Sequence, residues 1–282
     1  HRVSADYGEI EVSSNRPIGI LDSGFGGLSV ARAIRAAIPN EDLVFAADCA
    51  YAPYGDNSSE YIQARLEHVV SFLLAQQVKA LVFACNTATA VGIRAFRARL
   101  SMPIIGIEPA VFPALRHTRT GHIGVLATCR TIESQKYADV RHRAIEWAEV
   151  SRPMPVTVWD VPCPGLMECV ERVDFDSANV HELLVRYVDP LTAHNVDEIV
   201  LGCTHYPFLA NAIAKHAPKA TLIDPAPAVA QQLERRLAAL DLATPQTAPG
   251  TERFFASGAD AAREAVLRTL WSDPRVRLYE MD

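Results

Sequence analysis

Two cysteines stand where an apolar run ends in a polar turn. Cys85 follows the run 81–84, and Cys203 follows the run 199–202. The residues after them can form hydrogen bonds: Asn86, Thr87, Thr204 and His205. A thiol has a pKa of about 8.5, which a helix N-terminus or a nearby cation lowers, so that thiol and thiolate are both accessible near neutral pH. The pattern therefore predicts two acid–base thiols that act on one substrate. A free cysteine is otherwise a small buried hydrophobe, which is our interpretation of Cys129 and Cys169.

Further polar residues follow the other predicted strands, where ligands collect in open α/β sheets. They are Asp22, Ser23, Asp48, Cys49, Thr128, Cys129 and Cys163. The turn 22–27 is rich in glycine but does not read Gly-x-Gly-x-x-Gly, so a dinucleotide is not expected. A purely conformational role for this turn, with Asp22 as a helix cap, stays open.

The elements that must position these residues alternate between strand and helix. Strands are predicted at 18–21, 43–46, 80–84 and 104–107, and helices at 28–37, 58–76 and 89–100. Such alternation is typical of βαβ units around a mostly parallel sheet.

The pattern then starts again, because residues 123–126, 157–160 and 198–201 resemble the first three strands. A strand and turn at 220–225, a helix at 228–240, a strand at 254–255 and a helix at 259–270 follow. We therefore predict an α/β fold with two pseudo-symmetric domains, each with a mostly parallel sheet flanked by helices, and an active site in the cleft between them. Residues 1–16 form a polar N-terminal extension. Residues 17–109 plus 224–282 form the first domain, with Asp22 and Cys85, and residues 110–223 form the second, with Cys203 and His205.

Composition narrows the classes of function. The chain has 282 residues, of which 49% are hydrophobic and 21% charged, as in an average soluble globular protein. A net charge of −6 without a basic stripe argues against a nucleic-acid partner. No segment has the roughly 18 consecutive apolar residues of a membrane span. The six cysteines lack zinc-site spacing, so we expect no metal and interpret them as reduced thiols of a cytoplasmic protein.

Six segments together resemble glutamate racemases of the aspartate/glutamate racemase family. They are residues 19–28, 52–55, 84–90, 124–128 with Thr131, 201–207 and 222–224. The resemblance implies a racemase without metal or organic cofactor that interconverts L- and D-glutamate by a two-cysteine 1,1-proton transfer. It also implies a supply of D-glutamate for peptidoglycan synthesis.

The resemblance assigns roles to individual residues. Cys85 would be assisted by Asp22, and Cys203 by His205, with Glu171 as a further acidic residue on the second side. The implied substrate contacts are Asp22, Ser23, Tyr54, Gly55, Asn86, Thr87, Thr131, Thr204 and His205. The chain departs from the family at residues 49–51, which read Cys-Ala-Tyr where Thr-Ala-Arg is common, and at Gly165 and Glu168, where many members are more apolar.

Other functions stay open. An aspartate or other acidic amino-acid racemase would have the same fold, although His205 with the two residues after it favours glutamate. A non-catalytic amino-acid binding protein would not need the paired thiols. The polar residues 1–16 could instead serve a protein partner, and the oligomeric state is open, a homodimer included.

Overall fold

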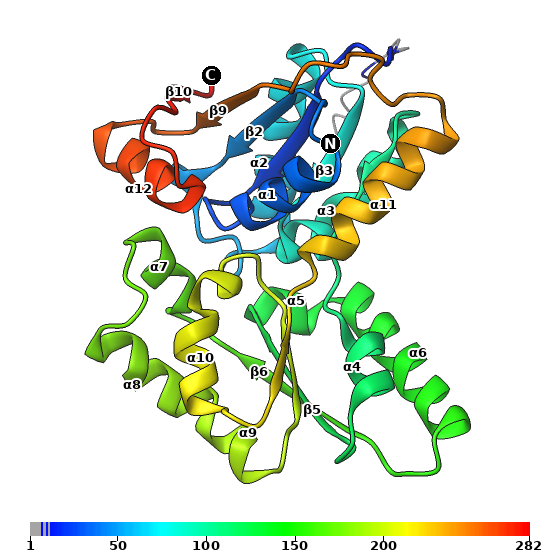
Figure 1. Ribbon diagram of the computed structural model, residues 1–282, viewed down its shortest axis with the longest axis vertical. Coiled ribbons are helices and arrows are strands. Elements are labelled where there is room, and N and C mark those ends of the chain that lie inside the picture. Colours follow the sequence, from blue (N-terminus) through cyan, green and yellow to red (C-terminus); the bar gives the residue numbers. More distant parts are fainter. Residues whose placement is uncertain (1–6, 8–9, 11) are drawn as a thin grey trace.

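Two parallel sheets, each flanked by its own helices, form the two halves of the molecule, which lie one above the other in Figure 1. This computed structural model describes Tyr7, Ile10 and residues 12–282. The predicted N-terminal extension, residues 1–16, therefore lies partly outside the described residues. Tyr7, one of the described residues of this extension, donates a hydrogen bond from its hydroxyl to the carboxylate of Glu67 at 2.6 Å.

The first sheet has the strand order β10-β9-β2-β1-β3-β4, and all its pairings are parallel. Its strands are β1 (Ile18–Asp22), β2 (Leu43–Ala47), β3 (Ala80–Phe83), β4 (Ile104–Ile105), β9 (Glu252–Ala256) and β10 (Leu278–Glu280). Its helices are α1 (Leu28–Ala37), α2 (Ser59–Ala75), α3 (Asn86–Arg99), α11 (Ala226–Ala239) and α12 (Ala261–Trp271), with a 3₁₀ turn at Cys49–Tyr51. Because β1 is central, its last residue, Asp22, lies between the ends of β2 and β3.

The second sheet has the order β6-β5-β7-β8 and is also parallel. Its strands are β5 (His122–Ala127), β6 (Thr157–Pro162), β7 (Glu198–Leu201) and β8 (Thr221–Ile223). Its helices are α4 (Val111–His117), α5 (Cys129–Glu133), α6 (Gln135–Ser151), α7 (Leu166–Glu171), α8 (Ala178–Tyr187), α9 (Asp189–Ala193) and α10 (Ala210–His216), with a 3₁₀ turn at Tyr206–Leu209. This order repeats the order β2-β1-β3-β4, so the predicted α/β fold with two similar sheets is confirmed.

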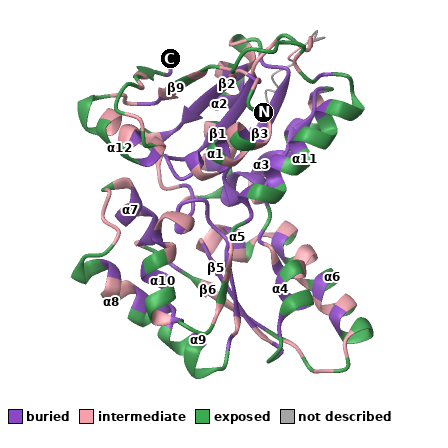
Figure 2. Ribbon diagram, viewed as in Figure 1, coloured by how far each residue is buried: buried purple, intermediate pink, exposed green. Residues whose placement is uncertain are grey.

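The central strands are buried on both faces, as expected for parallel sheets covered by helices (Figure 2). After β8 the chain returns to the half built on the first sheet, where α11 packs against α1 and β9 pairs with β2. No helix in the described part of the chain is long and apolar enough to cross a membrane.

Several predicted boundaries are wrong by one or two residues, and one is wrong by three. The helix expected at 89–100 begins three residues earlier, at Asn86. Cys85 has an extended backbone and is the N-cap of this helix, since its sulfur accepts a hydrogen bond from the amide of Ala88 at 3.3 Å. Cysteine is not a common cap, so its sequence signal is weak. The consequence is that the thiol lies at the N-terminus of a 14-residue helix.

Candidate active site

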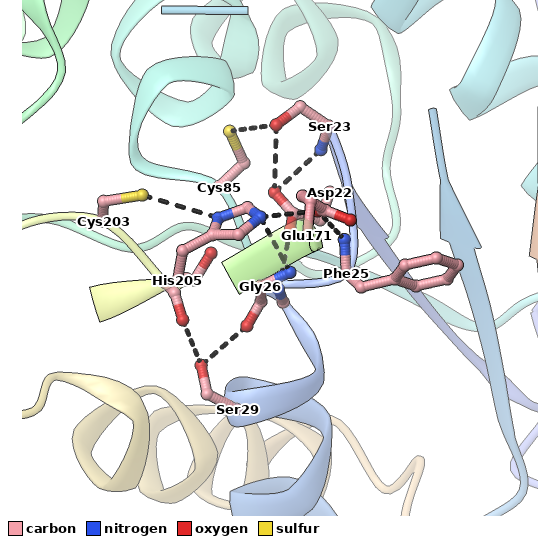
Figure 3. A network of polar contacts seen from close by, with 11 residues as sticks. Asp22, Ser23, Phe25, Gly26, Ser29, Cys85, Glu171, Cys203 and His205 are labelled. Atoms are coloured by element: carbon pink, nitrogen blue, oxygen red, sulfur yellow. Dashed lines mark hydrogen bonds and ion pairs between the residues drawn. The ribbon is translucent and has the colours of Figure 1, made fainter. Parts of the chain in front are cut away.

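The first thiol is buried beside a carboxylate. Cys85 is 6% exposed, and its sulfur lies 3.9 Å from the hydroxyl oxygen of Ser23 (Figure 3). Burial, and then the negative charge of Asp22, raise the pKa of this thiol well above its ordinary value. The amide of Ala88 and the hydroxyl of Ser23 act in the opposite direction, because they stabilise the thiolate.

Asp22 is positioned by the turn that follows β1. Its two carboxylate oxygens accept hydrogen bonds from the amides of Ser23 and Gly27, both at 2.7 Å. Burial raises the pKa of Asp22 from 3.8 to about 6, although His205 and the amide of Gly27 lower it. Asp22 can therefore take up or release a proton near neutral pH, as an acid–base group must.

The second thiol has an imidazole partner. The sulfur of Cys203 lies 3.6 Å from Nδ1 of His205, and Nε2 of His205 lies 2.7 Å from Oε1 of Glu171 (Figure 3). Burial lowers the pKa of His205, but its hydrogen bonds to Cys203 and Glu171 outweigh this effect, so that the pKa lies well above 6.5. Nε2 donates to the carboxylate of Glu171, because a carboxylate oxygen can only accept. The 3.2 Å contact from the amide of Gly26 to Nε2 is then a close approach, because a protonated nitrogen cannot accept.

His205 and Glu171 belong to the half built on the second sheet, and they pack against the glycine-rich turn that follows β1 in the first half. Glu171 ends α7, and its Oε1 accepts a hydrogen bond from the amide of Phe25 at 2.6 Å. A Cβ atom at Gly24 would lie under 3.0 Å from Glu171, and one at Gly26 would lie under 3.0 Å from the imidazole of His205. The turn therefore needs glycine so that the second half can approach closely.

Both thiols line one small cavity, which has about 10 Å³ of space for the centre of a water molecule; the roughly 270 Å³ that protein atoms leave unfilled there includes open solvent. Its lining consists of Asp22, Ser23, Gly55, Cys85, Asn86, Thr87, Thr128, Met167, Cys203, Thr204 and His205. The side-chain amide of Asn86 is buried, and neither its nitrogen nor its oxygen has a partner among the described residues. Since an unpaired buried amide costs about 1–3 kcal/mol, it indicates that a polar ligand completes this site.

Two predicted contacts lie behind the cavity wall. The hydroxyl of Tyr54 donates to Asp48 at 2.6 Å, and the hydroxyl of Thr131 bonds to those of Thr128 at 3.1 Å and Thr87 at 3.4 Å. Neither residue is among those that line the cavity. The other predicted substrate contacts line it, and Glu171 reaches it through His205.

Two lining residues have no role among the site residues that the resemblance implies. Thr128 follows β5 and was predicted only as one of the polar residues at strand ends, not as a substrate contact. Met167 lies in α7, and an apolar residue in a short helix gives no sequence signal of a site. Within the described part of the chain, no group of three or more His, Cys, Asp or Glu side chains could hold a metal ion.

The geometry suits proton transfer. Each thiol has its own charged partner, and hydroxyl and amide groups surround the space between them. A cation beside a sulfur favours the thiolate, whereas burial beside a carboxylate favours the thiol. The site therefore has two thiols placed to act as acid and base.

Comparisons with known proteins agree with this chemistry. The model of the Asp/Glu/hydantoin racemase family matches residues 27–233. The glutamate racemase of Ectopseudomonas mendocina is 45% identical over 259 residues, covering 91% of this chain and 95% of the relative. The glutamate racemase of Francisella tularensis, solved with D-glutamate, has a TM-score of 0.81 at 28% identity, covering 95% of this chain and 98% of that one. The Escherichia coli glutamate racemase, solved with L-glutamate, has a TM-score of 0.79 at 26% identity, covering 94% and 97%.

Proposed function

This chain belongs to the Asp/Glu/hydantoin racemase family, and from that premise we propose that it interconverts L- and D-glutamate. One observation carries the proposal: two thiols, each with its own charged partner, line a single cavity. A binding protein for amino acids would need neither thiol.

We propose a two-base mechanism in which Cys85 and Cys203 act on opposite faces of the α-carbon. One thiolate removes the α-proton, and the other thiol donates its proton to the opposite face, so that the substrate gains and loses one proton. The thiol and thiolate have then exchanged roles, and the reverse reaction starts from the opposite state. Asp22 assists Cys85, while His205, held by Glu171, assists Cys203.

The carbanion that develops at the α-carbon needs stabilisation from fixed dipoles and water exclusion. We propose that the amide of Asn86 and the hydroxyls of Ser23, Thr87 and Thr204 bind the substrate. The unpaired amide of Asn86 supports its part in this set. The N-terminus of α3, which begins at Asn86, adds partial positive charge beside a substrate carboxylate.

Tyr54 and Thr131 enter this proposal as supports of the wall rather than as contacts, because their hydroxyls bond to protein groups. We also propose the domain division 17–109 plus 224–282 against 110–223, which is supported by the membership of the strands in two sheets. We propose further that the protein is cytoplasmic, that it contributes to peptidoglycan synthesis and that it forms a homodimer. The six free cysteines are compatible with a reducing compartment.

Deuterium incorporation at the α-carbon tests the function. The protein is incubated in deuterated water with L-glutamate, D-glutamate and aspartate in separate reactions. We expect label and inversion with both glutamate enantiomers, and loss of racemisation in Cys85→Ser and in Cys203→Ser. Cys169→Ser is the matched control, since this buried cysteine does not line the cavity. Label in aspartate but not in glutamate would replace the proposal with an aspartate racemase.

A further inference from the structure

A buried carboxylate lies behind the wall of the active site. Asp48 follows β2, is 0% exposed, and donates its backbone amide to the carbonyl of Asp22 at 3.0 Å. Its Oδ1 accepts a hydrogen bond from the hydroxyl of Ser257 at 2.8 Å, and its Oδ2 accepts one from the hydroxyl of Tyr54 at 2.6 Å. A fully buried charge is costly unless it is paired, so this carboxylate needs a cation.

Arg65 of α2 is that cation. Its Nε and one terminal nitrogen each lie 2.9 Å from a different oxygen of Asp48. The guanidinium also lies over the ring of Tyr51, with its central carbon 3.4 Å from the ring centroid. A planar fork that binds both oxygens and stacks on an aromatic ring holds the carboxylate in one orientation, which a lysine cannot do.

The orientation of Asp48 determines where the hydroxyl of Tyr54 lies, and Tyr54 precedes Gly55 of the cavity wall. Gly55 is in close contact with the second half, since a Cβ atom there would lie 2.7 Å from the Cβ of Thr128. Tyr54 also packs in the same buried cluster as Cys85. A displaced Tyr54 would therefore move a wall that touches both the cavity and Thr128.

We propose that Arg65 is a positioning residue for the proposed racemisation: through Asp48 it fixes Tyr54, and through Tyr54 the Gly55 wall of the substrate cavity. The inference rests on the proposed function for its kinetic readout. Arg65 does not line the cavity, so it acts through Asp48 and Tyr54.

The test compares Arg65→Gln with wild type and with His68→Gln, an exposed position on the same helix. A lost charge-assisted hydrogen bond of about 1.4 kcal/mol or more corresponds to about a tenfold change. We therefore expect KM for glutamate to rise about tenfold in Arg65→Gln and to be unchanged in His68→Gln. Arg65→Lys keeps the charge but not the fork, so we expect it to recover stability more than KM.

A double-mutant cycle separates positioning from a general loss of stability. If Arg65 acts through Tyr54, Arg65→Gln in the Tyr54→Phe background should raise KM much less than about tenfold. The inference would be overturned if the increases in KM of the two single variants multiply in the double variant Arg65→Gln/Tyr54→Phe, or if Arg65→Gln has the wild-type KM. If Arg65→Gln does not fold, the double variant Asp48→Asn/Arg65→Gln is measured instead. It also removes the carboxylate charge that Arg65→Gln alone would leave buried and unpaired.

The crystal structure of the variant keeps this test independent of the proposed function. We expect Tyr54 and Gly55 to be displaced relative to wild type, and unchanged positions would overturn the inference whatever the enzyme acts on. A wild-type protein that exchanges no glutamate α-proton would overturn the proposed function alone.

Discussion

Replacing Gly26 with alanine puts a methyl group against the imidazole of His205. The added Cβ would lie under 3.0 Å from ring atoms of His205, closer than real Cβ atoms come. Gly26 is not among the glycines with a positive φ, so alanine fits its backbone, and the three atoms nearest to the added Cβ all belong to the ring of His205. The ring must therefore move by about 1 Å to regain a normal contact distance.

That displacement acts on the group that assists Cys203. His205 is held between the sulfur of Cys203 at 3.6 Å and Glu171 at 2.7 Å, so a shift of about 1 Å breaks at least one of these contacts. A misplacement of this size can cost about 100-fold in rate. We expect kcat for glutamate racemisation, followed by circular dichroism, to fall about 100-fold, and the free energy of unfolding to fall by about 1–3 kcal/mol.

Gly92→Ala is the matched control. Its Cβ would also lie under 3.0 Å from a neighbour, but that neighbour is the flexible end of Leu66, away from the cavity. We expect near wild-type kcat for Gly92→Ala. In a His205→Ala background, adding Gly26→Ala should cost little more, because the ring that it displaces is gone. A Gly26→Ala enzyme within about threefold of the wild-type kcat, a barrier change below about 1 kcal/mol, would refute the reasoning.

Three further predictions concern titration and buried charge. Because the pKa of His205 is raised in the folded protein, its contribution to stability is full below pH 6.5 and is lost as the pH rises through that raised pKa. Urea titrations at several pH values should therefore show that wild type loses stability relative to His205→Gln above pH 6.5. Asp22, with a native pKa of about 6, should be protonated at lower pH, so kcat/KM of wild type should fall as pH drops through about 6, and a profile that stays flat to pH 5 would contradict this role. Lys79→Met leaves Glu41 buried without its 2.6 Å ion pair and should cost about 3–5 kcal/mol in urea denaturation, whereas the pair Lys79→Met with Glu41→Leu should recover most of it.

Much of the fold was predictable because the first strands are continuous apolar runs with helices of ordinary length between them. The strand predicted at 18–21 is β1, and that predicted at 43–46 is β2. β10 gave no such signal, because it is a three-residue edge strand with only partly buried or exposed side chains. The start of α3 was missed for a chemical reason, since a sulfur replaces the oxygen that usually caps a helix.

The site was predictable where a residue lies at the end of a strand. Asp22 ends β1, and Cys85 and Cys203 each lie two residues after the end of a strand, as close to a strand end as the sequence predicts; the structure brings all three to one cavity. Orientation was not predictable: the hydroxyl of Tyr54 is directed to Asp48, and only the packing of α2 against the sheet decides this. The contact of Glu171 with the amide of Phe25 joins residues far apart in sequence, and no local pattern encodes it.

The acid–base groups are complete only when the two halves meet. The hydroxyl of Ser29 donates to the carbonyl of Thr204, Glu171 accepts from Phe25, and the hydroxyls of Thr87 and Thr128 lie 2.7 Å apart. Each of these contacts joins the half built on the first sheet to the half built on the second. Both thiols are less than 8% exposed, at 6% and 7%, so we expect these bonds to break when a substrate enters. We expect them to form again around the bound substrate, because closure against the turn 24–27 would return His205 to its contacts and exclude water from the proton transfer.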